Sequence, residues 1–146
     1  MASILKVDDL RGNTAAGNIT ITSEGGAATM QLQQGVTKQW TNINGGSGTP
    51  VVRDSFNNSS LTDNGTGDYT LSLSNSMDNA DYSLQTTGAG VASGAPSVFN
   101  RKLTVYTAST VPTTSQYRIA SGYNYYTGSA FLDNVYNYTT AHGDLA

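Results

Sequence analysis

Apolar and polar residues alternate in the middle of the chain with the period of a half-buried β-strand. In residues 68–74, Tyr69, Leu71 and Leu73 occupy one set of alternate positions, and threonine and serine occupy the other. Successive side chains of a strand point to opposite faces of a sheet, so this pattern predicts a strand with one apolar face and one polar face.

Turn-forming residues flank this strand on both sides. Residues 63–67 (DNGTG) tolerate a positive φ and allow the chain to reverse, and residues 78–81 (DNAD) predict a second reversal. Alternation resumes at residues 82–84. Residues 54–85 are therefore predicted to form a β-meander of three short strands.

Further short strands are expected on both sides of this region. Residues 30–34 fit either a strand or a single helical turn, and both alternatives remain open. Closely spaced strands separated by turn signals predict an all-β fold, an antiparallel sandwich or a small jelly-roll-like domain. The other predicted strands cover residues 18–22, 97–108 (with Val98, Leu103, Val105 and Tyr106 in the core), 116–121 (with Tyr117 and Ile119 on one face) and 132–140 (with Leu132, Asn134, Tyr136 and Tyr138 on one face).

The first 35 residues are too polar to build a core of their own. Their first apolar residues are Ile4, Leu5, Val7 and Leu10, in a short extended segment. Such an arm could lie against the following domain, or it could pack against identical chains or a partner. We favour the second alternative, because ordering so polar a segment needs contacts that offset the lost entropy. We expect an extended N-terminal arm over residues 1–35 and a β-rich domain over residues 36–146.

Composition supports the all-β interpretation and narrows the classes of partner. Ser, Thr, Asn and Gly make up nearly half of the chain, and good helix formers are scarce. The net charge is −3 and basic residues are scattered, which argues against nucleic acid as the main partner. No apolar run reaches the length of a membrane helix, so membrane insertion is not expected. Without cysteine, disulfides and thiolate catalysis are excluded. No secretory signal is evident, so synthesis in a cytoplasm is expected.

Little in the chain is typical of catalysis or metal binding. Residues 63–68 carry clustered oxygen ligands, but they lack the spacing and the bidentate glutamate of an EF-hand, and a plain turn is the favoured interpretation. The same holds for Asp78, Asn79 and Asp81. His142 is the only histidine and has no evident nucleophile to activate. We expect no catalytic residue, no bound metal and no cofactor, and therefore not an enzyme.

Aromatic residues are the more informative candidates. Trp40 is the only tryptophan, and Tyr123, Tyr125 and Tyr126 cluster in a predicted turn. Aromatic rings stack on sugar faces and are favoured at interfaces. For Trp40 a core position is the favoured interpretation. For the three tyrosines, packing between strands or subunits and contact with a sugar ligand remain open alternatives, because turns often carry exposed contacts.

Three stretches carry a resemblance to a known group of proteins. They are ILKVDDLRGNTAAGNITITSEGG (residues 4–26), MQLQQGVTKQW (30–40) and RDSFNNSSLTDNGTGDYTLSLSNSMDNADYSL (53–84). This pattern resembles tail-fibre and appendage proteins of marine bacteriophages, especially podoviruses that infect cyanobacteria. The resemblance implies a virion structural role, a homotrimer, and no catalytic residue.

The resemblance leaves the position on the particle open. The chain has no extended shaft repeat between the arm and the β-rich domain, so a short tail fibre or spike, a tail adaptor and a capsid decoration protein all remain possible. In the fibre interpretation, Ile4, Leu5, Val7 and Leu10 would attach the protein to other virion proteins of the tail or capsid. A carbohydrate-binding module that uses Tyr123, Tyr125 and Tyr126 to bind a host-surface glycan is a further alternative from another class.

Overall fold

The computed structural model describes residues 4–15, 19–23, 25–46, 48–90, 101–105, 111–125 and 128–146, with the backbone alone at 101–103, 124–125 and 128–129. The chain divides into two compact units, Met1–Val36 and Thr37–Ala146. Each unit is described by itself.

The first unit contains a short hairpin and one helical turn. Strands β1 (Thr20–Thr22) and β2 (Thr29–Gln31) pair antiparallel, with Ile21 opposite Met30. The helix α1 (Leu32–Gly35) follows β2 directly. Residues 30–34 thus contain both of the alternatives that their sequence left open.

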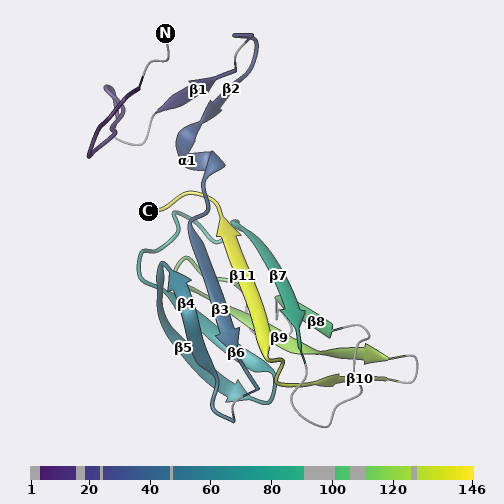
Figure 1. Cartoon of the computed structure of the whole chain (residues 1–146). Coiled ribbons are helices and arrows are strands. Elements are labelled where there is room, and N and C mark those ends of the chain that lie inside the picture. The colour runs from purple at the N-terminus through teal and green to yellow at the C-terminus, as the bar shows by residue number, and fades with distance from the viewer. Residues whose placement is uncertain are drawn as a thin grey trace. The chain divides into compact units, whose positions relative to one another are not determined.

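The second unit is an antiparallel β-sandwich, as expected (Figure 1). One sheet has four strands in the order β4-β3-β11-β7. The other sheet has five strands. Four of them follow the order β10-β9-β6-β5, and the fifth strand, β8, also pairs with β9. The four-stranded sheet consists of β3 (Gln39–Asn44), β4 (Val51–Phe56), β7 (Ser83–Ala89) and β11 (Tyr136–His142). The five-stranded sheet consists of β5 (Asn58–Gly65), β6 (Asp68–Leu73), β8 (Arg101–Val105), β9 (Gln116–Tyr125) and β10 (Gly128–Phe131).

The core of the sandwich is built mainly by the five-stranded sheet. The alternation in residues 68–74 is confirmed, because β6 buries its tyrosine and both leucines. The predicted shared face of Tyr117 and Ile119 on β9 is also confirmed. The buried apolar cluster contains Ile43, Tyr69, Leu71, Leu73, Met77, Tyr117, Ile119 and Ala141.

The predicted β-meander over residues 54–85 is wrong at its third strand. β5 and β6 form the expected hairpin, but β7 pairs with β11 in the opposite sheet. The second edge of β6 is already occupied by β9, so no pairing position is left for β7 there. Between β6 and β7 the chain buries Met77, which forms an isolated bridge with Leu145 and leads the chain across to the other sheet.

The C-terminal strand differs from its prediction in both bounds and orientation. It runs from Tyr136 to His142, so two of the residues expected on its face, Leu132 and Asn134, precede it. Asn134 is buried, whereas Tyr136 and Tyr138 point outward. The inward positions are Asn137, Thr139 and Ala141.

The predicted strand over residues 97–108 is described only at Arg101–Val105. Val98 and Tyr106 lie outside the described residues, as does the side chain of Leu103. Val105 is half-buried.

Asn57 connects the two sheets where β4 is followed by β5. Its φ of 55° is the only positive value recorded for a described residue other than glycine. The side-chain amide donates to the carbonyls of Lys38 (3.0 Å) and Asn75 (3.1 Å), and its oxygen accepts from the Asn75 amide (2.6 Å). Asparagine tolerates this left-handed conformation and satisfies backbone groups around it, so the chain can change sheets within one residue.

Candidate functional site

The outer surface of the four-stranded sheet carries four partly exposed aromatic side chains. They come from the adjacent strands β4, β3 and β11, and we call them, with Arg53, the aromatic face. Their exposed fractions are 52% for Phe56, 37% for Trp40, 41% for Tyr136 and 42% for Tyr138. The expectation that Trp40 lies in the core is therefore wrong.

Strand register brings these rings together. Trp40 on β3 lies opposite Phe56 on β4 and opposite Thr140 on β11. Tyr138 lies opposite Asn42, which makes it a diagonal neighbour of Trp40, within reach of a long side chain. The rings of Tyr136 and Tyr138 are nearly parallel, with 11° between their planes and 6.2 Å between their centroids.

A β-bulge directs Arg53 across this surface. The register of β3 and β4 shifts between Asn42 and Ile43, so Arg53 is the extra residue on β4. A bulge can re-aim a side chain in this way. The guanidinium Nη1 donates to the carbonyl of Val135 at 2.7 Å, and its carbon lies 4.4 Å from the centre of the Tyr136 ring. Arg53 therefore restricts where the Tyr136 ring can lie.

The inner surface of the same sheet is unusually polar. Gln39, Thr41, Asn137 and Thr139 are almost completely buried there. Their polar groups are satisfied by two small networks. In the first, the Tyr117 hydroxyl pairs with Gln39 Oε1 (2.8 Å) and Thr139 Oγ1 (2.7 Å), and the Gln39 amide donates to the Thr41 hydroxyl.

The second network ties β11 to β9. The Ser121 hydroxyl donates to Asn137 Oδ1 at 2.9 Å, and the Asn137 amide donates to the Asn134 carbonyl at 2.9 Å. Buried polar groups are costly only when they lack such partners. The two networks therefore allow the sheet to turn its polar side chains inward and its aromatic side chains outward.

The pKa values of three buried or half-buried tyrosines are raised above the ordinary value. Burial raises the pKa of Tyr82 to about 12. Burial also raises the pKa of Tyr117, and it raises that of Tyr69, where a hydrogen bond to Asp133 (2.6 Å) adds to the effect. In the opposite sense, burial lowers the pKa of Lys38, and the nearby Asp144 carboxylate partly offsets this.

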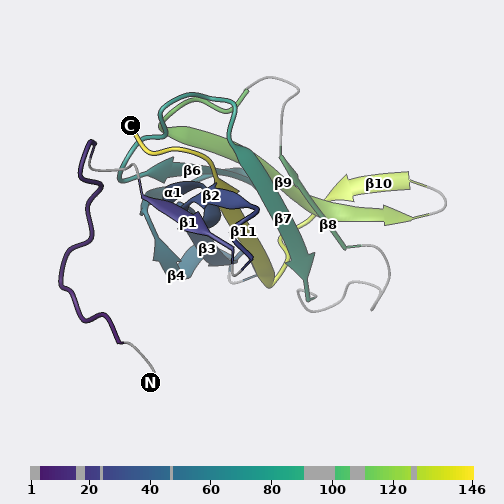
Figure 2. The ribbon, with the colours of Figure 1, turned by 90° about the horizontal axis from the view of Figure 1, so that it is seen from above.

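The three tyrosines expected at a host contact are not collected into one described site. Tyr123 and Tyr125 belong to β9 and pair with β10, so these two residues lie in a strand and not in the predicted turn. Tyr123 is partly exposed, and the β9–β10 hairpin to which it belongs projects beyond the four-stranded sheet (Figure 2). The side chain of Tyr125 and the whole of Tyr126 lie outside the described residues. Tyr123 and Trp40 belong to different sheets.

The four apolar residues proposed for attachment are all exposed. They lie in an extended segment outside any described strand or helix, and Ile4 and Leu5 are 78% and 76% exposed. Val7 and Leu10 are exposed as well, and so are Ile21 and Met30 of the hairpin. No described residue between positions 4 and 36 is buried.

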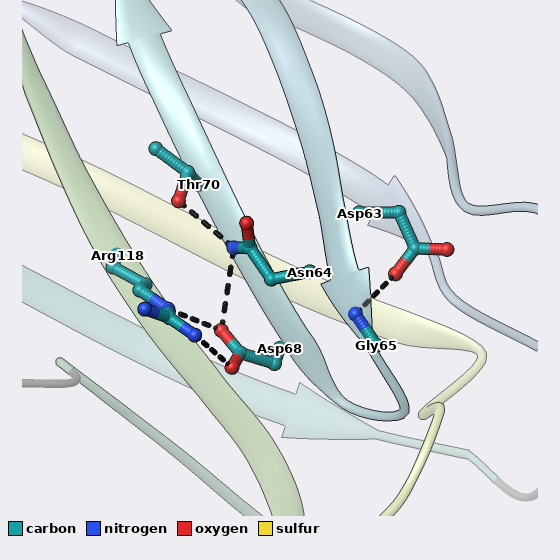
Figure 3. A network of polar contacts seen from close by, with 6 residues as sticks. All are labelled: Asp63, Asn64, Gly65, Asp68, Thr70 and Arg118. Atoms are coloured by element: carbon teal, nitrogen blue, oxygen red, sulfur yellow. Dashed lines mark hydrogen bonds and ion pairs between the residues drawn. The ribbon is translucent and has the colours of Figure 1, made fainter.

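The acidic turn at residues 63–68 is organised by its own hydrogen bonds (Figure 3). Both oxygens of Asp68 pair with the guanidinium of Arg118 on β9, at 2.6 Å from Nε to Oδ1. Asn64 donates to the Thr70 hydroxyl (2.9 Å), and Asp63 accepts from the Gly65 amide (2.9 Å). These contacts link β5, β6 and β9 and favour the interpretation as a structural turn.

The other candidate residues for metal binding or catalysis, in the turn after β6 and at His142, make contacts only with nearby parts of the fold. In the turn after β6, Asn79 accepts from the Asp81 amide (2.9 Å), and His142 ends β11 opposite Ser83. Within the described parts of the chain, no three acidic, histidine or cysteine side chains converge as metal ligands would. No helix among the described residues has the length and apolarity needed to cross a membrane.

Sequence reasoning singled out Trp40 but missed the rest of the aromatic face. A signal for it was present, because Tyr136 and Tyr138 are two residues apart and must share one side of a strand. No known protein family, curated protein or solved structure gives a significant match to this chain.

Proposed function

We propose that this protein is a non-enzymatic structural protein of a bacteriophage virion, a short trimeric tail fibre or spike. Residues 1–35 attach it to other virion proteins, and the β-sandwich is the part exposed for contact with the host surface. The observation that carries this proposal is the first unit, in which no described residue is buried.

The first unit needs contacts that it does not make within itself. Its hairpin has only three residues in each strand, and a two-stranded hairpin of this size is marginal in water. Its apolar side chains, from Ile4 to Met30, gain their burial only against another surface. Identical copies and neighbouring virion proteins provide such surfaces in an assembled particle.

The second unit differs from the arm because it has a core of its own. It has its own buried cluster and two hydrogen-bonded sheets, so it does not depend on residues 1–36 for a core. A folded exposed domain joined to an arm without a core suits an appendage. The resemblance of residues 4–26, 30–40 and 53–84 to tail-fibre proteins agrees with this role.

Deleting residues 1–35 tests the proposal. The truncated protein should keep the circular dichroism and cooperative unfolding of a β-domain, but it should be missing from purified particles. As a matched control, Thr14→Ser in the full chain changes an exposed polar residue of the arm and should leave incorporation unchanged. Particles that contain the truncated protein at the normal level would refute the attachment role.

Copy number separates the fibre from a capsid decoration protein. Quantitative mass spectrometry of purified particles should give a few trimers per particle if the protein is a fibre or spike. A ratio close to that of the major shell protein would place it on the capsid instead. Sedimentation of the full chain should show three copies, and the truncated chain should show fewer.

A further inference from the structure

We propose that the aromatic face of the four-stranded sheet binds a neutral oligosaccharide. The inference rests on the proposed function in taking this ligand to be a glycan of the host surface. Binding itself is a property of the protein alone and can be measured without particles.

The first argument is the inverted pattern of the sheet. Strand β3 points Gln39 and Thr41 inward beside Ile43 and points Trp40, its largest apolar side chain, outward. A register shift of one residue would exchange the two faces of a strand. The hydrogen bonds of Tyr117 and Ser121 hold the present arrangement in place. The sheet thus exposes its large rings while it buries hydrogen-bonded polar side chains.

The same inversion occurs on a second strand. Strand β11 points Asn137 and Thr139 inward and Tyr136 and Tyr138 outward. Two neighbouring strands that share one inversion produce a continuous surface, because Trp40 and Tyr138 are diagonal neighbours. Scattered exposed aromatic residues need no explanation, but a contiguous group indicates a contact surface.

The second argument is the chemistry between the rings. Trp40 lies opposite Thr140, which lies opposite Gln85 on β7. Tyr138 lies between Asn42 on β3 and Thr87 on β7. Trp40 thus has a hydroxyl group on one side, and Tyr138 lies between a carboxamide and a hydroxyl group. A sugar ring presents C–H groups on its faces and hydroxyls around its edge, so it matches rings flanked by hydrogen-bonding side chains.

The third argument is charge. The four strands of this sheet carry one arginine, one aspartate and one histidine, namely Arg53, Asp54 and His142. Arg53 is already engaged by the Val135 carbonyl and the Tyr136 ring. No cluster of cations is present on these strands to hold an anionic polymer. The surface is therefore suited to a neutral glycan.

A second copy of this chain is the main alternative occupant, and the composition of the surface argues against it. The buried centre of an interface between copies is more apolar than an ordinary surface. Here the rings alternate with Asn42, Thr140 and Thr87, and Val51 and Ala89 are the exposed aliphatic side chains of β3, β4, β7 and β11. Polar groups so placed would lose water without regular partners in a dry interface.

The experiment compares variants of the full chain on an array of short neutral hexose and N-acetylhexosamine oligosaccharides, with uronic-acid oligosaccharides beside them. The parent protein should bind one or more neutral probes. Trp40→Ala and Tyr138→Ala should each weaken that binding about tenfold or more, as expected for a central aromatic contact. Phe131→Ala is the matched control, because Phe131 is as exposed as Phe56 but belongs to the five-stranded sheet.

A second measurement uses the parent chain and needs no substitution. Trp40 is the only tryptophan, so its fluorescence reports directly on the aromatic face. The bound neutral oligosaccharide should shift or quench that emission in a saturable way. This readout applies even where a variant fails to fold.

Several results would overturn the inference. They are binding of no neutral probe, binding that Trp40→Ala and Tyr138→Ala leave intact, and binding lost instead in Tyr123→Ala. Concentration-dependent association of copies that Trp40→Ala abolishes would assign the surface to self-assembly. The Trp40→Ala variant should still be incorporated into particles, because the arm alone should govern incorporation. This measurement therefore distinguishes a failure of the glycan-binding proposal from a failure of the attachment proposal.

Discussion

The two sheets of the sandwich face each other with different chemistry. The five-stranded sheet points Leu71, Leu73 and Ile119 inward, as the hydrophobic effect favours. The four-stranded sheet points Gln39, Thr41 and Thr139 inward and compensates with hydrogen bonds. One sheet therefore supplies most of the apolar burial, and the other is free to expose its rings. Apolar burial is therefore concentrated in one sheet, and the exposed rings of the aromatic face are concentrated in the other.

The largest loss of stability of the sandwich is expected at alkaline pH. The pKa of an unfolded tyrosine is about 10, and those of Tyr69, Tyr82 and Tyr117 are raised in the fold, to about 12 for Tyr82. Above about pH 10 the unfolded chain loses these protons first, so stability that is fully present below pH 10 falls as the pH rises. Lys38, whose pKa is lowered, acts in the opposite direction near its unfolded value of 10.5.

Denaturant titrations followed by circular dichroism at a series of pH values check this expectation. The unfolding midpoint should be level up to about pH 10 and should fall steeply toward pH 12. Tyr82→Phe removes one of the titrating groups and should make the fall shallower. A midpoint that is unchanged at pH 12 would contradict the assignment of these protons.

Leu71→Ala should give the next largest loss of stability, because it removes a buried apolar side chain from the five-stranded sheet. Leu71 is completely buried between the sheets. Removing such a side chain costs about 2–5 kcal/mol of unfolding free energy, depending on how far the site collapses. Ser72→Ala, at the next position on the opposite face of β6, is the control and should cost less than about 0.5 kcal/mol. Chemical denaturation measures both.

Tyr117→Phe tests the polar side. It removes the hydroxyl shared by Gln39 and Thr139 while keeping the ring, so a loss of about 1–3 kcal/mol is expected. Adding Thr139→Val should cost less than the two separate losses combined, because both ends of one hydrogen bond are then apolar. If Tyr117→Phe were as stable as the parent, the hydrogen bonds of Tyr117 would contribute nothing to keeping Gln39 and Thr139 on the inner face.

Tyr138→Thr should have the smallest effect on stability. The ring points outward and threonine is well accommodated in strands, so the change should cost less than about 1 kcal/mol. Thermal unfolding of the variant beside Tyr117→Phe makes the comparison direct. A loss larger than that of Tyr117→Phe would show that the outer ring is a structural element.

The parts of the fold that could be predicted from sequence are those where apolar residues alone decide. Residues 68–74 and the pair Tyr117 and Ile119 alternate clearly, and both were confirmed. The inner face of β11 could not be found in this way. Thr139 is buried because its partner Tyr117 comes from a distant strand, and alternation within one segment contains no information on that partner.

The error at Trp40 has the same origin. A large aromatic residue was expected inside, but Ile43, the aliphatic residue of β3, shares alternate positions with Gln39 and Thr41. The isoleucine was the better guide to the inward face. The error at the third strand of the meander had another cause, because β9, from a later part of the chain, occupies the second edge of β6, and β7 pairs with β11 instead.

The position of β11 has a consequence for biosynthesis. It lies between β3 and β7, and it pairs Thr41 with Thr139, far apart in the chain. Until residues 136–142 leave the ribosome, β3 and β7 present open edges that have no partner within their own chain. Non-local pairing is slow, and open edges recruit other strands. We therefore expect strand exchange between nascent chains on one polysome to compete with closure of the sheet during this interval.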